Sequence, residues 1–176
     1  MNETIAAVST PFGQGALAVI RLSGAEALPV AGQALGRAPE GLEERHAHRA
    51  KVRAEDGVVL DDVVVTVFRG PRSYTGEDVV EISCHGGVLV VQRLLERLLE
   101  CGARSAEAGE FTQRAFLNGK LDLTQAEAVM DVISAQTDLA LRAAQHQLGG
   151  RIGVETEILR GAILEILAHV EAYIDF

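Results

Sequence analysis

The sequence has two cysteines among its 176 residues, Cys84 and Cys101, and they form no CxxC pair. Two isolated cysteines cannot supply the disulfide framework of a small secreted domain, so a reducing cytoplasm is the expected compartment. The chain also lacks a basic leader and has no apolar run near the roughly 20 residues that a membrane helix needs. We therefore expect a cytoplasmic protein that does not insert into a membrane.

Basic residues are scarce relative to acidic ones, since 16 lysines and arginines stand against 25 aspartates and glutamates and the formal net charge is -9. Binding to a phosphate backbone depends on clustered lysine and arginine, so the chain is not expected to hold nucleic acid by itself. The glycine loops of nucleotide-binding proteins are missing too, because neither GxGxxG nor GxxxxGK[ST] occurs. The remaining composition, 48% hydrophobic and 23% charged, is typical of a globular protein.

The strongest functional signal is the stretch 71–87, which reads PRSYTGEDVVEISCHGG. Glycine, proline and serine punctuate its first half, which predicts a loop at 70–76 that presents ligand-contacting groups. From Val79 onward the residues alternate, so a strand is predicted with Glu81 on its more polar face. A half-buried carboxylate is costly unless it meets a basic side chain or the hydrogen-bond donors of a ligand. The stretch therefore predicts a binding edge, and the alternative is an edge strand with one solvated face.

Arg21 is a second candidate, because it ends an apolar row on a central strand predicted over 16–22. It needs a carboxylate or an anionic ligand, unless its side chain extends past the strand end into water. Cys84 and His85 are adjacent, but neighbours on a strand point to opposite faces, so they are not expected to pair as nucleophile and base. A buried structural role is the expectation for Cys84.

Histidines give no metal signal. His46 and His48 are predicted to share one face of a strand over 46–53, but no third ligand stands at a recognisable spacing, so no metal site is predicted.

The element pattern predicts an α+β layered domain followed by helices alone. In the first part, Ser23 is predicted to cap a helix that Pro29 breaks or restarts. The second part is predicted to begin with a capping box from Thr124 to Glu127 and to end in a helix over 151–173 with an apolar stripe. Such a stripe needs a partner, so these helices look like part of a larger bundle. The remaining predicted strands cover 4–9 and 58–68 and a short stretch near Arg104; the remaining predicted helices cover 88–100, 110–117 and a segment starting at Thr137.

Three long blocks carry a resemblance: TIAAVSTPFGQGALAVIRLSG at 4–24, PRSYTGEDVVEISCHGG at 71–87 and GEFTQRAFLNGKLDLTQAEAV at 109–129. In this order they resemble the family of tRNA-modification GTPases called MnmE or TrmE, over nearly the whole chain. Departures are small, with Ala108 where the family pattern usually has proline and Ser83 at a position that the family varies.

The resemblance implies a tetrahydrofolate-binding and dimerisation α+β domain at 1–119, similar to the folate domains of aminomethyltransferases. It implies that 120–176 holds the first helices of a central helical domain. The family inserts a GTPase domain into those helices, so this chain would lack it and is expected not to hydrolyse GTP. The family's folate contacts fall on Arg21, Glu81 and Lys120, with no catalytic residue and no metal ligand expected in the chain itself.

The family also implies cofactors and partners for the whole protein. It uses GTP with Mg²⁺ and K⁺, forms a homodimer, and works with the flavoprotein MnmG (GidA) to add a (carboxymethyl)aminomethyl group to C5 of the wobble uridine of tRNA. A folate such as 5-formyltetrahydrofolate supplies the one-carbon unit. A pterin offers adjacent N–H donors to a carboxylate, and its glutamyl tail offers carboxylates to Arg or Lys, so which residue takes which end stays open.

Two other readings remain. The first part could be a structural dimerisation and docking module without a ligand, which a folate-binding measurement would separate from the main hypothesis. It could also be a free-standing folate-dependent methyltransferase, which a one-carbon transfer assay would reveal.

Overall fold

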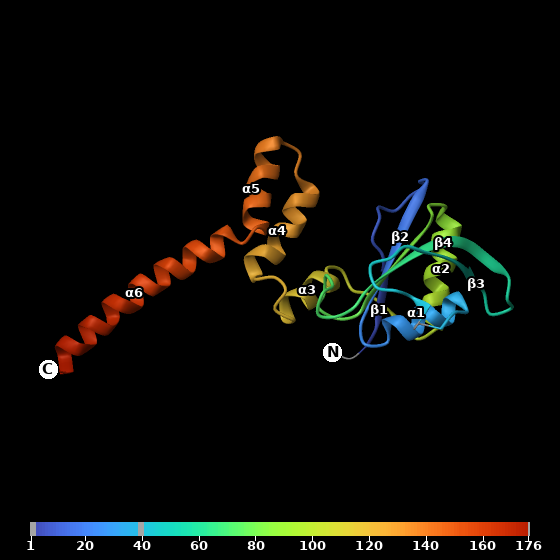
Figure 1. Cartoon of the computed structure of the whole chain (residues 1–176). Coiled ribbons are helices and arrows are strands. Elements are labelled where there is room, and N and C mark those ends of the chain that lie inside the picture. Colours follow the sequence, from blue (N-terminus) through green and yellow to red (C-terminus); the bar gives the residue numbers. More distant parts are fainter. Residues whose placement is uncertain (1–2, 39–40, 176) are drawn as a thin grey trace. The chain divides into compact units, whose positions relative to one another are not determined.

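The computed structural model describes residues 3–38 and 41–175, and the chain divides into two compact units, Met1–Asn118 and Gly119–Phe176 (Figure 1). In the described part of the first unit, six strands form one mixed sheet in the order β3-β4-β5-β2-β1-β6. All neighbouring strands are antiparallel except β1 and β6, which run parallel. The predicted α+β fold class is confirmed. The strands are β1 Ile5–Val8, β2 Leu17–Ser23, β3 His48–Arg53, β4 Val59–Phe68, β5 Val79–His85 and β6 Arg104–Ser105.

The helices α1, Ala27–Leu35, and α2, Val88–Glu100, both pack against one face of this sheet (Figure 1). Alternation along the strands turns every second side chain toward these helices, which buries one apolar row from each central strand. The core therefore lies between the sheet and the helix pair, and the opposite face carries the polar rows. The buried strand residues include Ala18, Ile20 and Leu22 of β2, Val63, Val65 and Val67 of β4, and Val80, Ile82 and Cys84 of β5.

Strand β5 lies inside the sheet, because it pairs with β2 along its whole length and with β4 over most of it. The alternative of an edge strand with a solvated face is therefore wrong. Its polar face is accessible because neither α1 nor α2 covers that side of the sheet. Alternation in the sequence shows that one face is polar, but it does not show whether the strand lies at the edge or inside the sheet. The prediction that 16–22 forms a central strand is confirmed by β2.

The predicted start of the first helix is wrong. Helix α1 begins at Ala27 with Glu26 as its N-cap, and Ser23 is the last residue of β2. Pro29 does not break the helix, because it lies in the first turn, where the backbone N–H groups have no intrahelical acceptor. His46 precedes β3 instead of lying on it, so it does not share a strand face with His48.

A third helix of the first unit, α3, Glu110–Leu117, follows β6 and ends at Asn118. Gly119 then has a φ of 69°, a left-handed conformation that glycine adopts without strain. The predicted helix that ends at Leu117, with its stop at Asn118-Gly119, is confirmed.

The second unit is helical in its described residues: α4 Leu123–Ser134, α5 Asp138–Leu148 and α6 Arg151–Asp175. The capping box was predicted from Thr124 to Glu127, but Asp122 is the N-cap and its partner is Gln125. The Asp122 carboxylate accepts both the Gln125 N–H and the Thr124 hydroxyl, so it satisfies the helix start better than threonine could. The apolar stripe predicted for α6 is solvent-exposed in this unit, at Ile152, Leu159, Ile163, Ile166, Val170 and Ile174.

None of the helices within the described ranges is both long and apolar enough to cross a membrane.

Candidate ligand-binding site

Arg21 and Glu81 face each other across the two central strands, as direct partners in the register of β2 and β5. Nε and Nη2 of Arg21 both donate to Oε1 of Glu81, at 2.9 and 2.7 Å. The two side chains are 25% and 30% exposed, so the pair is half-buried on the sheet face that α1 and α2 leave uncovered. Both sequence expectations are met: the arginine has a carboxylate, and the carboxylate has a basic partner.

Two aromatic rings lie against the guanidinium of Arg21. Its Cζ atom is 5.1 Å from the centre of the Tyr74 ring and 5.6 Å from that of the Phe111 ring. Tyr74 comes from the loop 70–78 and Phe111 from the start of α3, and the Tyr74 hydroxyl shares a 2.9 Å hydrogen bond with Thr112 Oγ1. Both distances fall within the range of cation–π attraction. The site thus combines one ion pair with two flat apolar walls.

The second carboxylate oxygen of Glu81, Oε2, makes no hydrogen bond to any residue in 3–38 or 41–175. A carboxylate oxygen accepts two hydrogen bonds with ease, so Oε2 can take an N–H donor from a ligand while Oε1 holds Arg21. The neighbouring row on the same face is formed by Val19 of β2, Ser83 of β5 and Val64 of β4, which extends the site as a mostly apolar floor.

Lys120, the third residue that the resemblance implies, follows Gly119 in the second unit, and its place in the site stays a prediction. The structure therefore brings two of the three candidate residues together.

Cys84 and His85 do not pair, as predicted. Cys84 is buried in the core, where burial raises the pKa of its thiol, so the thiolate that a nucleophile needs is disfavoured. His85 instead uses Nδ1 to contact Asp61 Oδ1 at 2.7 Å, and its backbone N–H donates to Asp61 Oδ2. Sequence reasoning missed this pair because its members are 24 residues apart on different strands. No three His, Cys, Asp or Glu side chains within the described ranges gather closely enough to hold a metal ion.

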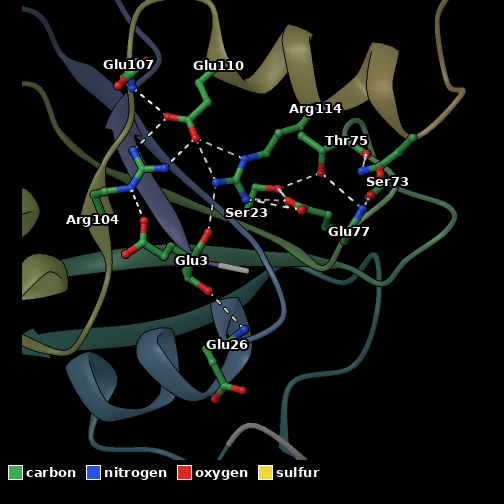
Figure 2. Close-up of polar contacts among 12 residues, drawn as sticks. Glu3, Ser23, Glu26, Ser73, Thr75, Glu77, Arg104, Glu107, Glu110 and Arg114 are labelled. Atoms are coloured by element: carbon green, nitrogen blue, oxygen red, sulfur yellow. Dashed lines mark hydrogen bonds and ion pairs between the residues drawn. The ribbon is translucent and has the colours of Figure 1, made fainter. Parts of the chain in front are cut away.

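A buried ion network connects α3, β6 and the loop 70–78 (Figure 2). Its centre is Arg114 of α3, whose side chain is 2% exposed. Arg114 donates to Glu77 Oε2 at 3.1 Å, to Glu110 Oε1 at 2.9 Å and to the Glu3 carbonyl at 2.9 Å. Arg104 of β6 forms a second fork onto Glu110, with distances of 2.7 and 3.0 Å.

The same network reaches the loop 70–78 through hydroxyl groups (Figure 2). The Ser23 hydroxyl donates to Glu77 Oε2 at 2.7 Å and shares a 2.6 Å hydrogen bond with Thr75 Oγ1. Asn118, at the end of α3, donates from Nδ2 to the Thr75 carbonyl at 2.7 Å. Ser73 donates to the Glu77 carbonyl and closes the loop on itself.

The electrostatics of the network favour the charged forms. The hydrogen bond from Arg104 is the largest cause that lowers the pKa of Glu110 to about 2, with further contributions from the Glu107 N–H and Arg114. Reciprocally, Glu110 and Glu3 raise the pKa of Arg104 above its usual value. Sequence reasoning missed the network, although the i, i+4 spacing of Glu110 and Arg114 on a predicted helix was a signal for part of it.

Comparisons with known proteins match both units of the chain. Residues 4–120 match the family model described as GTP-binding protein TrmE N-terminus, and residues 123–176 match the MnmE helical domain. The chain is 57% identical over 176 residues to the tRNA modification GTPase MnmE of Akkermansia muciniphila, covering 99% of this chain and 39% of that protein. It is 51% identical over 176 residues to the protein of the same name from Opitutus terrae, covering 100% and 38% of the two chains. For Bacillus subtilis MnmE the identity is 49% over 181 residues, with 99% and 39% covered.

The chain thus spans about 39% of the length of the curated relatives that it matches.

Proposed function

Because the chain belongs to the MnmE family of tRNA modification GTPases, we propose that its first unit binds a reduced folate, such as 5-formyltetrahydrofolate, at the Arg21–Glu81 pair. The observation that carries this proposal is the geometry of the pair: a half-buried carboxylate with one open oxygen, fixed by an arginine and flanked by two aromatic rings. A pterin matches it, since its N–H edge can donate to Glu81 while its flat ring lies against apolar walls.

Each residue then has a separate task. Arg21 orients Glu81 and neutralises its charge, Glu81 accepts N–H donors of the pterin, and Lys120 contacts a tail carboxylate as a point charge. The chain's own residues bind and orient the folate, and the bound folate supplies the one-carbon chemistry.

The proposal extends to the whole protein, of which this chain is the N-terminal part. A GTPase domain outside the chain hydrolyses GTP with Mg²⁺ and K⁺, and the protein acts with the flavoprotein MnmG in the cytoplasm. Together they add the (carboxymethyl)aminomethyl group to C5 of the wobble uridine of tRNA. The net charge of -9 fits a complex in which surfaces outside this chain bind the tRNA.

We also propose that the first unit forms a homodimer. Support comes from exposed apolar residues on the loop 10–15 and at the start of α2. The loop 10–15 is joined to the start of α2 through a hydrogen bond from Gly15 N–H to the Gly86 carbonyl at 2.9 Å. Phe12 of this loop and Leu89 of α2 are 95% and 70% exposed, and a hollow of about 330 Å³ lies between the loop and the helix. A second copy of the chain is the occupant that would cover these residues.

Calorimetry with 5-formyltetrahydrofolate tests the folate site. Removing the acceptor in Glu81→Ala should cost about 1.5 to 3 kcal/mol per charge-assisted hydrogen bond, at least tenfold in affinity. Glu81→Gln should also bind weakly, because its amide offers one acceptor and pairs poorly with Arg21. Glu96→Ala is the matched control, since it removes the carboxylate of another arginine–glutamate pair, which is exposed on α2.

Wild-type affinity in a folded Glu81→Ala variant would show that this carboxylate is not the pterin anchor. A wild-type chain that binds no folate at all would favour the docking module, and one-carbon transfer by the isolated chain would favour a free-standing methyltransferase.

A further inference from the structure

The two walls of the site are attached directly to the buried network. Tyr74 immediately precedes Thr75, and Phe111 immediately follows Glu110. Thr75 and Glu110 are both buried in the network, whereas the two rings lie against Arg21. Each aromatic side chain is therefore held by a neighbour whose own position is fixed by hydrogen bonds.

Arg114 joins the elements that carry these walls. It contacts Glu77 of the loop 70–78 on one side and Glu110 of α3 on the other, and no other side chain among the described residues bonds to both carboxylates. The Tyr74–Thr112 hydrogen bond is a second, exposed link between the same two elements. The spacing between loop and helix thus depends on the buried guanidinium of Arg114, on this surface hydroxyl pair and on the hydrogen bond from Asn118, at the end of α3, to the Thr75 carbonyl.

Stability alone does not account for such a network. A buried ion cluster often stabilises a protein no better than apolar residues of equal volume, although removal of one member is costly. Arg114 can form hydrogen bonds to three segments at once because its planar guanidinium has five N–H donors in a rigid arrangement. This arrangement sets both the directions and the distances of the groups that it contacts. The two central members of the network, Arg114 and Glu110, are buried and hydrogen-bonded to each other, and a buried polar network whose groups are satisfied favours one arrangement of the elements that it joins.

We propose that Arg114 is a positioning residue of the folate site: through Glu77 and Glu110 it fixes the distance between the loop 70–78 and α3, and so keeps Tyr74 and Phe111 beside Arg21. This inference rests on the proposed function for its ligand. A ligand that meets preset walls binds without the cost of ordering them, so loosening the network should weaken binding without removing any ligand contact.

The decisive variant is Arg114→Lys, which keeps the charge and loses the fork. In a double-mutant cycle with Tyr74→Ala, calorimetry with 5-formyltetrahydrofolate should give at least about a fivefold loss of affinity for Arg114→Lys. The double variant should lose less affinity than the two single losses combined, because both changes affect the wall formed by Tyr74. Additive losses, or unchanged affinity in Arg114→Lys, would overturn the inference. Arg93→Lys on α2 is the control for an arginine that pairs with a carboxylate at the surface, and it should bind like the wild type.

Amide hydrogen exchange of the full chain without ligand gives an independent readout. In Arg114→Lys, exchange should accelerate in 70–78 and 110–117 while β4 keeps its wild-type rates. Uniform acceleration would indicate a general structural role and overturn the inference, as would unchanged rates. If Arg114→Lys fails to fold, Thr75→Val takes its place, since it removes the hydroxyl that Ser23 contacts and keeps the side-chain shape.

The two proposals can fail separately. If the wild type binds no folate, the proposed function fails, and the exchange rates still decide whether Arg114 holds the loop and α3. If the wild type binds folate and Arg114→Lys binds equally well, the folate site stands and Arg114 is not its positioning residue.

Discussion

For Arg21 and Glu81, the sequence predicted the kind of partner that each side chain needs but not which residue or ligand provides it. Glu81 was expected to meet a basic side chain or ligand donors, and Arg21 a carboxylate or an anionic ligand unless it extended into water; the structure pairs the two residues at 2.7 Å. The pair is half-buried, so salt screens it less than it screens exposed charges. Lys120 is exposed, so salt would screen the contact that we propose between it and a tail carboxylate of the ligand. The two cations should therefore respond differently to ionic strength.

Salt dependence separates the two cations. If Lys120 meets the flexible tail of the folate, Lys120→Ala should weaken binding clearly at low salt and little at high salt. Arg21→Ala should weaken binding at both, because it releases Glu81 from its fixed orientation. Calorimetric titrations at two salt concentrations check this, and an Arg21→Ala loss that vanishes at high salt would place Arg21 at the tail instead.

Glu110 should make the stability of the folded chain depend on pH in the acid range. Its pKa is about 2 in the folded chain against an ordinary 4.5, so it adds stability that is complete above pH 4.5 and is lost as pH falls toward 2. The size of this contribution is on the order of 3 kcal/mol. Glu110→Gln should be less stable than the wild type at neutral pH, and the difference should narrow in that acid range. Urea unfolding at several pH values measures it, with the exposed Glu107→Gln as control; a constant difference would contradict the assignment.

At the level of elements, local chemistry sets where helices begin. The α4 start uses Asp122, whose pKa is lowered chiefly by the hydrogen bond from the Gln125 N–H. The α5 start uses Thr137, which accepts the Ala140 N–H at 3.1 Å, as the sequence predicted. Both helix starts follow from the preference of N-caps for short polar side chains.

Loss of the α4 cap should destabilise the second unit. Asp122→Ala removes the acceptor of the Gln125 N–H and should cost about 1 kcal/mol. Far-UV circular dichroism during urea unfolding would show an earlier loss of helix. Asp131→Ala, in the body of α4, is the matched control and should not lower stability, since alanine favours helix more than aspartate. Equal effects of the two changes would mean that the cap contributes nothing.

At the scale of the whole molecule, exposed apolar surface indicates association. The first unit exposes Phe12 and Leu89, and the second exposes the apolar residues of α6. In the family, the helical part belongs to a longer chain, so the α6 face is expected to be covered there. The first-unit surface is the candidate for pairing with a second copy.

Light scattering at tens of micromolar should give the mass of a dimer. Phe12→Ser combined with Leu89→Ser should shift the mass toward the monomer, because it removes apolar surface at the proposed interface. Ile163→Ser on α6 controls for association through the second unit and should leave the dimer intact. A wild-type monomer, or a dimer that only the α6 change disrupts, would exclude the first-unit interface.

The chain alone should not hydrolyse GTP, because it has no GxxxxGK[ST] loop to hold the phosphates. Phosphate release from the purified chain, above that of a Glu81→Ala preparation made in parallel and free of contaminating GTPases, would contradict this expectation.

The sequence predicted the helices and strands well but predicted poorly which distant residues contact one another. Strand alternation located β2 and β5, and the Asn118-Gly119 pair located the end of α3, because these signals act over a few residues. The order of the strands, with β5 inside the sheet, could not be read from alternation. The loop 70–76 was predicted to present ligand-contacting groups, and Tyr74 of this loop lies against Arg21, but the approach of Phe111 from α3 had no local signal.

By itself the sequence determined the fold class, the positions of most helices and strands, and the blocks that carry the family resemblance. These depend on backbone conformation and side-chain periodicity, which neighbouring residues decide. Only the tertiary structure decided that Arg21 meets Glu81, 60 residues away, that Asp61 fixes His85, and that Arg114 joins the loop to α3. The reason is physical: strand order and register set which distant side chains become neighbours, and burial then forces their charges to pair.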